Sequence, residues 1–140
     1  MITHLTYVSS ATRLLPVEAL RGLLDQARRN NGRDDITGIL LYRDGNFMQT
    51  IEGPEQAISQ LHSRLEADPR HTGVSVLLTG EREDRRFDGW SMGFRDLGDV
   101  TVRDTPGFSE FLNTPLTAAA FGENPSASEQ LLLVFKRHMR

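Results

Sequence analysis

The sequence of 140 residues contains no cysteine. Without thiols the chain has no disulfide, no thiolate metal ligand and no cysteine nucleophile. Its four histidines, at positions 4, 62, 71 and 138, do not show the spacing of metal ligands, and no carboxylate pair or histidine–nucleophile arrangement is visible. The residues therefore do not favour an enzyme, and we expect none.

Long hydrophobic runs and clustered positive charge are also missing. The longest apolar runs, such as Gly38–Tyr42 and Leu131–Phe135, are far too short to span a bilayer, and the N-terminus lacks the pattern of a signal peptide. The formal net charge is −3, and the few basic pairs are diluted by acidic residues. We therefore expect a cytoplasmic protein that contacts neither a membrane nor, directly, a nucleic acid.

The rest of the composition is that of an ordinary globular protein, with 38% hydrophobic and 25% charged residues. The length suits a single compact domain, and regular patterning extends to about residue 97. Beyond it Pro106, Pro115 and Pro125 divide the chain into short pieces. We expect a domain at residues 1–97 and a helical extension at residues 98–140, which caps the open face of a sheet or a second subunit.

The spacing of apolar residues predicts five strands and two helices. The expected strands are Ile2–Ser9, Ile36–Tyr42, Asn46–Glu52, Val74–Thr79 and one within Phe87–Phe94; one helix follows Pro16 and closes at Asn30–Gly32, and the other lies between Pro54 and Pro69. The pair Asp44-Gly45 is typical of a tight hairpin. The order βαββαββ predicts a ferredoxin-like α+β fold. It has a five-stranded mixed sheet, two helices on one face and C-terminal helices capping the other.

Three polar side chains raise questions that their positions alone leave open. Gln49 shares a strand face with Phe47 and Ile51, where its amide needs hydrogen-bond partners. A glutamine bonded to backbone carbonyls in the core would explain it equally well. The ring of Tyr7 is expected in the core, where its hydroxyl needs a partner, and Asn31 at the expected helix end suits a C-terminal cap. Binding of a flat ligand in the groove between the two helices is the alternative for all three.

Five ordered blocks of sequence decide between these readings. The blocks are LTYVSSAT at Leu5–Thr12, RRNN at Arg28–Asn31, ITGILLYRDGNFMQTIEGP at Ile36–Pro54, ADPRH at Ala67–His71 and RRFDGWSMGF at Arg85–Phe94. Together they resemble the BLUF family, whose members sense blue light with a flavin. The chain resembles a short, stand-alone member, because its tail shows no cyclase, phosphodiesterase or DNA-binding pattern.

The resemblance implies a non-covalently bound flavin between the two helices, FAD with FMN as the alternative. Tyr7 matches the photoactive tyrosine of the family and Gln49 its switching glutamine. Asn31 matches the asparagine that bonds the pyrimidine edge of the flavin. In the implied mechanism, the excited flavin takes an electron and then a proton from Tyr7 through Gln49. The rotated or tautomerised amide then donates a hydrogen bond to the flavin C4 carbonyl, which moves absorption to the red. No covalent adduct is needed, in keeping with the absence of cysteine.

Four further residues match the family less directly. Asn30 and Arg64 correspond to a second asparagine and a basic residue near the ring carbonyls or the ribityl chain. Trp90 and Met92 correspond to the pair whose packing alters during signalling, and Met92 is also expected to contact the flavin. The implied output is a change in protein–protein contacts with an unidentified partner, and a homo-oligomer, a dimer or larger, is expected.

The alternative function is a ferredoxin-like adaptor that has lost its flavin, which the colour of the protein would distinguish. Two positions depart from the family pattern. Asp35 stands where many relatives have glycine, so the loop before the second strand is expected to differ. Met48 replaces a branched apolar residue beside Gln49. Neither position matches a flavin contact.

Overall fold

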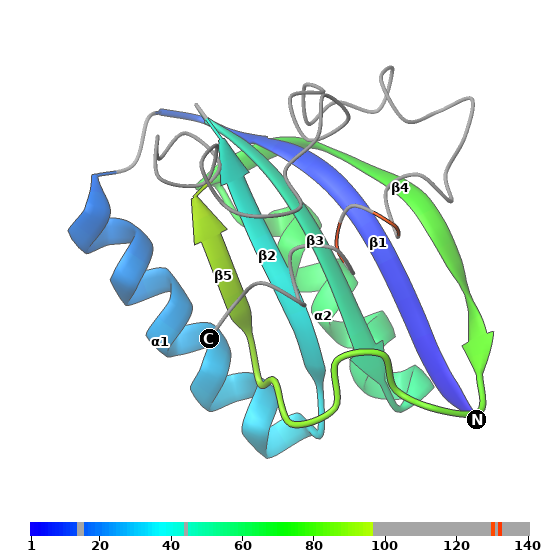
Figure 1. The fold of residues 1–140 in the computed structure, drawn as a ribbon. Coiled ribbons are helices and arrows are strands. Elements are labelled where there is room, and N and C mark those ends of the chain that lie inside the picture. The colour runs from blue at the N-terminus through cyan, green and yellow to red at the C-terminus, as the bar shows by residue number, and fades with distance from the viewer. Residues whose placement is uncertain (14–15, 44, 97–129, 131, 133–140) are drawn as a thin grey trace.

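The computed structural model describes residues 1–13, 16–43, 45–96, 130 and 132. Two helices and five strands follow one another as β1 (Ile2–Ala11), α1 (Val17–Asp34), β2 (Thr37–Arg43), β3 (Asn46–Gly53), α2 (Glu55–Ala67), β4 (His71–Arg82) and β5 (Gly93–Asp96) (Figure 1). This order confirms the predicted ferredoxin-like α+β fold. The predicted C-terminal helices and Asp44 of the predicted hairpin lie outside the described residues, apart from two helical positions at 130 and 132.

The strands lie in the order β4-β1-β3-β2-β5. Neighbouring strands are antiparallel except for β5, which is parallel to β2. The central strand β3 places Gln49 opposite Tyr7 on β1 and opposite Leu40 on β2. Because side chains at directly paired positions point to the same face of a sheet, these three residues share one face.

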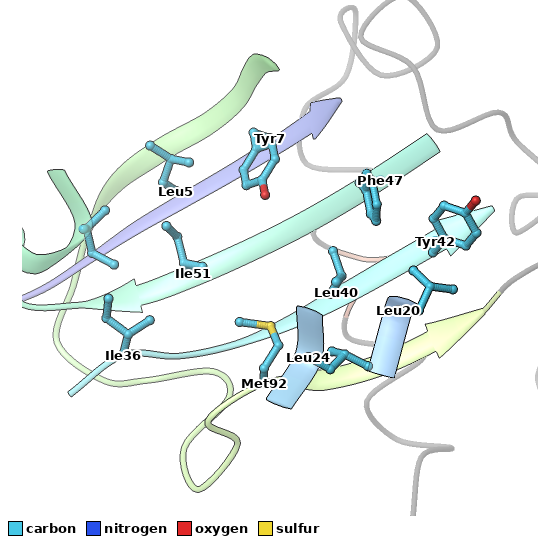
Figure 2. Close-up of a cluster of buried hydrophobic side chains, with 11 residues drawn as sticks. Leu5, Tyr7, Leu20, Leu24, Ile36, Leu40, Tyr42, Phe47, Ile51 and Met92 are labelled. Atoms are coloured by element: carbon cyan, nitrogen blue, oxygen red, sulfur yellow. The ribbon is translucent and has the colours of Figure 1, made fainter. Parts of the chain in front are cut away.

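That face packs against both helices. A single buried cluster joins Leu20 and Leu24 of α1 and Ile58 of α2 to residues of the sheet, which are Leu5, Tyr7, Leu40, Tyr42, Phe47 and Ile51, with Ile36 and Met92 beside them (Figure 2). Apolar residues at helical spacing on α1 therefore meet apolar residues at alternate positions on the strands. The helix-facing core is where Gln49 was expected, and it is where Gln49 lies.

The opposite face of the sheet is equally buried. Val8, Ile39, Leu41 and Met48 point to that side and are at most 3% exposed. Leu132, far along the chain, is also completely buried. Among the described residues, neither helix is long and apolar enough to cross a bilayer.

Helix α1 is longer than predicted. It continues through Asp34 and ends at Asp35, which adopts the left-handed conformation with φ of 59° and ψ of 39°. Aspartate tolerates this conformation better than most residues, so a glycine is not required at the helix end. The expected closure at residues 30–32 was wrong, and so was the reading of Asn31 as a C-terminal cap. Asn31 lies inside the helix, with its side chain available for other contacts.

The fifth strand begins later than predicted. The sequence placed this strand within Phe87–Phe94, but β5 starts at Gly93, so that Trp90 and Met92 precede it. Their backbone carbonyls are engaged elsewhere: Gly38 N donates to Trp90 O at 2.9 Å, and Arg28 Nε donates to Met92 O at 2.9 Å. These bonds fasten the stretch between β4 and β5, which we call the 85–92 segment, to β2 and α1.

Candidate functional site

A cavity of about 180 Å³ lies between the two helices and the sheet, at the place where the sequence predicts a ligand groove. It is lined from α1 by Leu23, Gln26, Ala27, Asn30 and Asn31; from the sheet by Tyr7, Leu40, Phe47 and Gln49; and from α2 and the turn after it by Leu61, Arg64, Leu65, Asp68, Arg70 and His71. Apolar side chains form the walls, and amide, phenol and charged groups gather at the edges. Such a lining suits a flat apolar molecule with polar atoms on its rim.

A chain of three side chains crosses the inner end of this cavity. The Tyr7 hydroxyl donates a hydrogen bond to Gln49 Oε1. Gln49 Nε2 in turn donates to Met92 Sδ at 3.3 Å. All three residues are buried, with exposed fractions of 2%, 6% and 2%. Figure 2 shows Tyr7 and Met92 on the same, helix-facing side of the sheet.

The Gln49 amide contacts a phenol with its oxygen and a thioether with its nitrogen. In the observed orientation, the amide oxygen accepts a hydrogen bond from the Tyr7 hydroxyl. The amide nitrogen donates to the thioether of Met92, which is a weak acceptor. If the amide turned over, its nitrogen would donate to the Tyr7 oxygen, since a phenol accepts as well as donates. The amide oxygen would then face away from the hydroxyl. The observed bonding differs from that of a core glutamine bonded to backbone carbonyls, because both ends of the amide contact other side chains.

Tyr7 is held in its protonated form. Its burial, and to a smaller extent the negative charge of Asp68, raises the pKa of Tyr7 well above the ordinary value of a phenol. The hydroxyl therefore stays a hydrogen-bond donor across the physiological range. The arrangement keeps a proton on Tyr7 Oη, with Gln49 Oε1 as its acceptor.

Asn31 joins the cavity to the 85–92 segment. It is 2% exposed, lines the cavity and donates through Nδ2 to Ser91 O at 2.8 Å. Arg28, one helical turn earlier, bonds the next carbonyl, Met92 O. Two residues of one helix face thus hold successive peptide units of the segment. The helix extension that the sequence did not predict is what places Asn31 here.

Asn30 and Arg64 both line the cavity, as the resemblance implied. Asn30 is half-buried on α1. Arg64 stands near the end of α2, about half exposed, and its Nη2 lies 3.6 Å from Asp34 Oδ2. This ion pair bridges the ends of the two helices at the mouth of the cavity. Because it is exposed, its contribution to stability is small.

Trp90 and Met92 stand apart from the cavity lining. Met92 contacts Gln49 from the far side of the amide, and Trp90 is half-buried in the 85–92 segment. The structure therefore brings Tyr7, Asn30, Asn31, Gln49 and Arg64 around one space. Met92 does not line the cavity but contacts Gln49, which does, and Trp90 is not among the lining residues.

Among the lining residues that were not predicted are three ionisable ones, Asp68, Arg70 and His71. Asp68 accepts two hydrogen bonds from Arg70 Nε, at 3.0 and 2.9 Å, and this bonding lowers the pKa of the Asp68 carboxyl. His71 Nε2 donates to Leu65 O at 2.6 Å, which leaves Nδ1 to accept from Ser9 Oγ at 2.8 Å. All three belong to the block ADPRH, so the signal was present, but the positions of their side chains were not readable from spacing.

The residues present fit a flavin. An isoalloxazine ring is flat and largely apolar, and one edge carries carbonyl and N–H groups. The cavity offers apolar walls, and two asparagines and a glutamine are among its lining residues. Asn31 and Gln49 are the residues that would hold this edge, and Asn30 and Arg64 would hold groups nearer the mouth. Within the described ranges, no cluster of histidine, aspartate and glutamate could hold a metal ion.

Comparison with known proteins points the same way. The family model described as BLUF, sensors of blue-light using FAD, matches residues 2–93. The chain is 40% identical over 86 residues to the photoactivated adenylate cyclase subunit beta of Euglena gracilis, which covers 61% of this chain and 10% of the relative. The chain thus spans about a tenth of the length of this curated relative.

Two solved structures are similar over most of the chain. The dark-state structure of BlrB, a BLUF protein, has a TM-score of 0.77 and 30% identity, covering 96% of each chain. The structure of BlrP1 from Klebsiella pneumoniae with FMN and cyclic diGMP has a TM-score of 0.66 and 32% identity, covering 89% of this chain and 35% of that one.

Proposed function

Because the chain belongs to the BLUF family of blue-light sensors that use FAD, we propose that Tyr7, Gln49 and Asn31 form the light-responsive site of a photoreceptor. The observation that carries the proposal is the hydrogen-bond chain from Tyr7 through Gln49 to Met92 at the inner end of the cavity. This chain contains the proton held on Tyr7, the amide of Gln49 that can reverse, and the contact of Gln49 with Met92 in the 85–92 segment.

Bound FAD, or FMN in its place, would supply the absorption of blue light and an excited state that accepts an electron. The chain supplies the response. Tyr7 holds a proton on Oη and is positioned to pass it toward Gln49 Oε1. Gln49 then settles with its amide reversed, so that Nε2 no longer donates to Met92 Sδ. Asn31 keeps the polar edge of the cavity aligned while this happens, since its side chain is anchored at Ser91 O.

The signal leaves through the 85–92 segment. Loss of the Gln49 contact changes the partner of Met92, and Trp90 lies two residues away on the same stretch of backbone. A local exchange of hydrogen bonds thereby biases a two-state element, as ligand and light switches do in general. The output is a change in contacts with another protein or with a second copy in a dimer or larger homo-oligomer. The described part contributes no catalytic activity of its own.

Residues 98–140 are proposed to form an extension that caps the face of the sheet opposite the helices, beside a light-sensing domain at residues 1–97. The support is the burial of Val8, Leu41 and Met48 on that face together with the complete burial of Leu132.

The test is an absorption spectrum of the purified, flavin-loaded protein before and immediately after blue illumination. We expect a flavin band that moves reversibly to longer wavelength without bleaching. Tyr7→Phe should bind flavin and lose the shift completely, because the hydroxyl proton is gone. Tyr42→Phe is the matched control: Tyr42 is 5% exposed in the same core but does not line the cavity, so this variant should shift normally.

A normal shift in Tyr7→Phe would contradict the proposed role of Tyr7. A protein that stays colourless after incubation with excess flavin would contradict the photoreceptor function and favour the adaptor.

A further inference from the structure

Glu52 is a completely buried acidic residue outside the light-responsive site. It lies on β3, three residues after Gln49, and therefore points to the opposite face of the sheet. A buried carboxylate is costly unless donors surround it, so its partners indicate its role. The mechanism described above does not use it.

Glu52 forms an ion pair with Arg82 of β4, whose Nη1 lies 3.9 Å from Oε2, and two of its hydrogen-bond partners come from the start of the 85–92 segment. Oε2 accepts from Arg86 N at 3.0 Å and Oε1 from Phe87 N at 2.6 Å. Thr37 Oγ1, on β2, adds a third bond to Oε1 at 3.0 Å. Arg85 completes the connection, because its Nη1 donates to Thr37 Oγ1 at 2.9 Å and to Glu52 O at 3.2 Å. One carboxylate therefore fastens two successive peptide N–H groups of the segment to the central strand.

The path from this attachment to the switch is short. Trp90 N donates to Phe87 O at 3.0 Å, which closes a turn, and Met92 follows two residues later with its sulfur against Gln49. The 85–92 segment is thus attached to β3 at both ends. Glu52 holds its beginning with charge-assisted bonds. At its end the backbone carbonyls of residues 90, 91 and 92 are bonded by β2 and α1, and Gln49 adds a single weak bond to the side-chain sulfur of Met92.

We propose that Glu52 is a positioning residue for the light response: it fixes the beginning of the 85–92 segment so that Met92 Sδ is presented to the Gln49 amide. The proposal rests on the proposed function of Gln49. With one end fixed, reversal of the amide is transmitted as a displacement of residues 88–92. With that end loose, the segment absorbs the change and no longer presents a defined partner to the amide in the dark.

Glu52→Gln tests this with little change of shape. An amide nitrogen would replace one carboxylate oxygen and face a donor, either Arg86 N–H or Phe87 N–H. Hydrogen exchange of the amide that loses its acceptor should accelerate about tenfold in the flavin-free protein, as expected for loss of a buried acceptor. Glu55→Gln, at an exposed position on α2, is the matched control and should leave both amides unchanged.

The second readout is the rate at which the flavin-loaded protein returns to its dark spectrum. Glu52→Gln should retain flavin and the red shift but recover more slowly, about threefold or more, because the dark orientation of the amide loses a well-placed acceptor. A residue with a merely structural role would change exchange or stability and leave the recovery rate unaltered. Unchanged recovery, whatever the exchange result, would therefore overturn the proposal.

Thr37 provides a second test if Glu52→Gln does not fold. Thr37→Val removes one donor to Glu52 and the acceptor for Arg85, whereas Thr37→Ser keeps the hydroxyl. Slower recovery in the valine variant with normal recovery in the serine variant would support the proposal, and equal recovery in both would overturn it. If the unaltered protein showed no light-induced shift, the proposed function itself would fail. If the unaltered protein showed a normal shift and the variants recovered at the normal rate, the proposed role of Glu52 would fail and the proposed function would stand.

Discussion

Gln49 and Glu52 are buried polar side chains on the same central strand, and they face opposite sides of the sheet. Gln49 has a phenol on one side and a thioether on the other. Glu52 is surrounded by donors from three residues, all directed at its two oxygens. An amide has both a donor and an acceptor end and can be satisfied in two orientations, whereas a carboxylate only accepts.

This difference assigns different tasks to the two faces of β3. In the proposed function, the helix-facing side combines the cavity with the group that changes partners. The opposite side has a group that cannot do so, because reversing any of its contacts would leave a buried donor without an acceptor. In the proposed mechanism Gln49 is the group that moves, and Glu52 is the fixed attachment of the 85–92 segment.

The largest expected effect comes from replacing each residue by leucine. Glu52→Leu should lower the free energy of unfolding by about 3–5 kcal/mol, because several buried donors lose their acceptor at once. Gln49→Leu should change it by about 1 kcal/mol, since apolar burial offsets the lost bond to Tyr7, and should abolish the light-induced shift. Chemical denaturation of the flavin-free proteins measures the first quantity without a contribution from ligand binding.

Similar losses of stability in the two leucine variants would contradict the proposed difference between Glu52 and Gln49. A light-induced shift that survives in Gln49→Leu would contradict it as well.

The sequence predicted one of these two residues and not the other, for a physical reason. Gln49 is conspicuous because it interrupts a face of Phe47 and Ile51, and its partner Tyr7 is found by strand alternation. Glu52 ends its strand beside Gly53, where a charged residue suggests an exposed end. Its burial depends on a segment more than thirty residues later folding back over it, which local patterning does not contain.

The same limit explains the errors at the ends of elements. Helix α1 was predicted to stop at Asn30–Gly32, residues that favour termination, yet it continues to Asp34. The tertiary bonds of Arg28 and Asn31 to residues 91 and 92 outweigh that local preference. Likewise, Trp90 and Met92 alternate like strand residues, but side chains of α1 bond the carbonyls of Ser91 and Met92 that a strand neighbour would use. The order of the elements and the helix-facing positions of Tyr7 and Gln49 followed from pattern. Their place in a ligand site followed only from the family resemblance, and contacts between distant loops followed from neither.

A smaller effect tests whether Tyr7 remains a donor to Gln49. The pKa of Tyr7 is raised in the folded protein, by burial first and by Asp68 second, while an unfolded tyrosine ionises near pH 10. Its contribution to stability is therefore fully present below about pH 10 and is lost as the pH rises further. The difference in unfolding free energy between the unaltered protein and Tyr7→Phe should fall by about 1.4 kcal/mol between pH 8 and pH 11.

Using this difference cancels the ionisation of Tyr42 and of other groups common to both proteins. A difference that stays constant up to pH 11 would mean that folded Tyr7 ionises as readily as an unfolded tyrosine. The hydroxyl would then not be a permanent donor, and the preferred orientation of Gln49 would depend on pH.

The smallest effect concerns the bond between Gln49 Nε2 and Met92 Sδ. Met92→Leu keeps the volume of the side chain and removes only a weak acceptor, so it should cost less than about 1.5 kcal/mol in stability. Met48→Leu is the matched control, because Met48 is a methionine buried on the face of β3 opposite Gln49. The two variants should be equally stable, but only Met92→Leu should slow the return to the dark spectrum, by about twofold, since the dark orientation loses one weak bond. An equal change in recovery for both would mean that core packing in general, and not the contact with sulfur, sets the rate. The switching side of β3 would then differ from the fixed side only in its cavity.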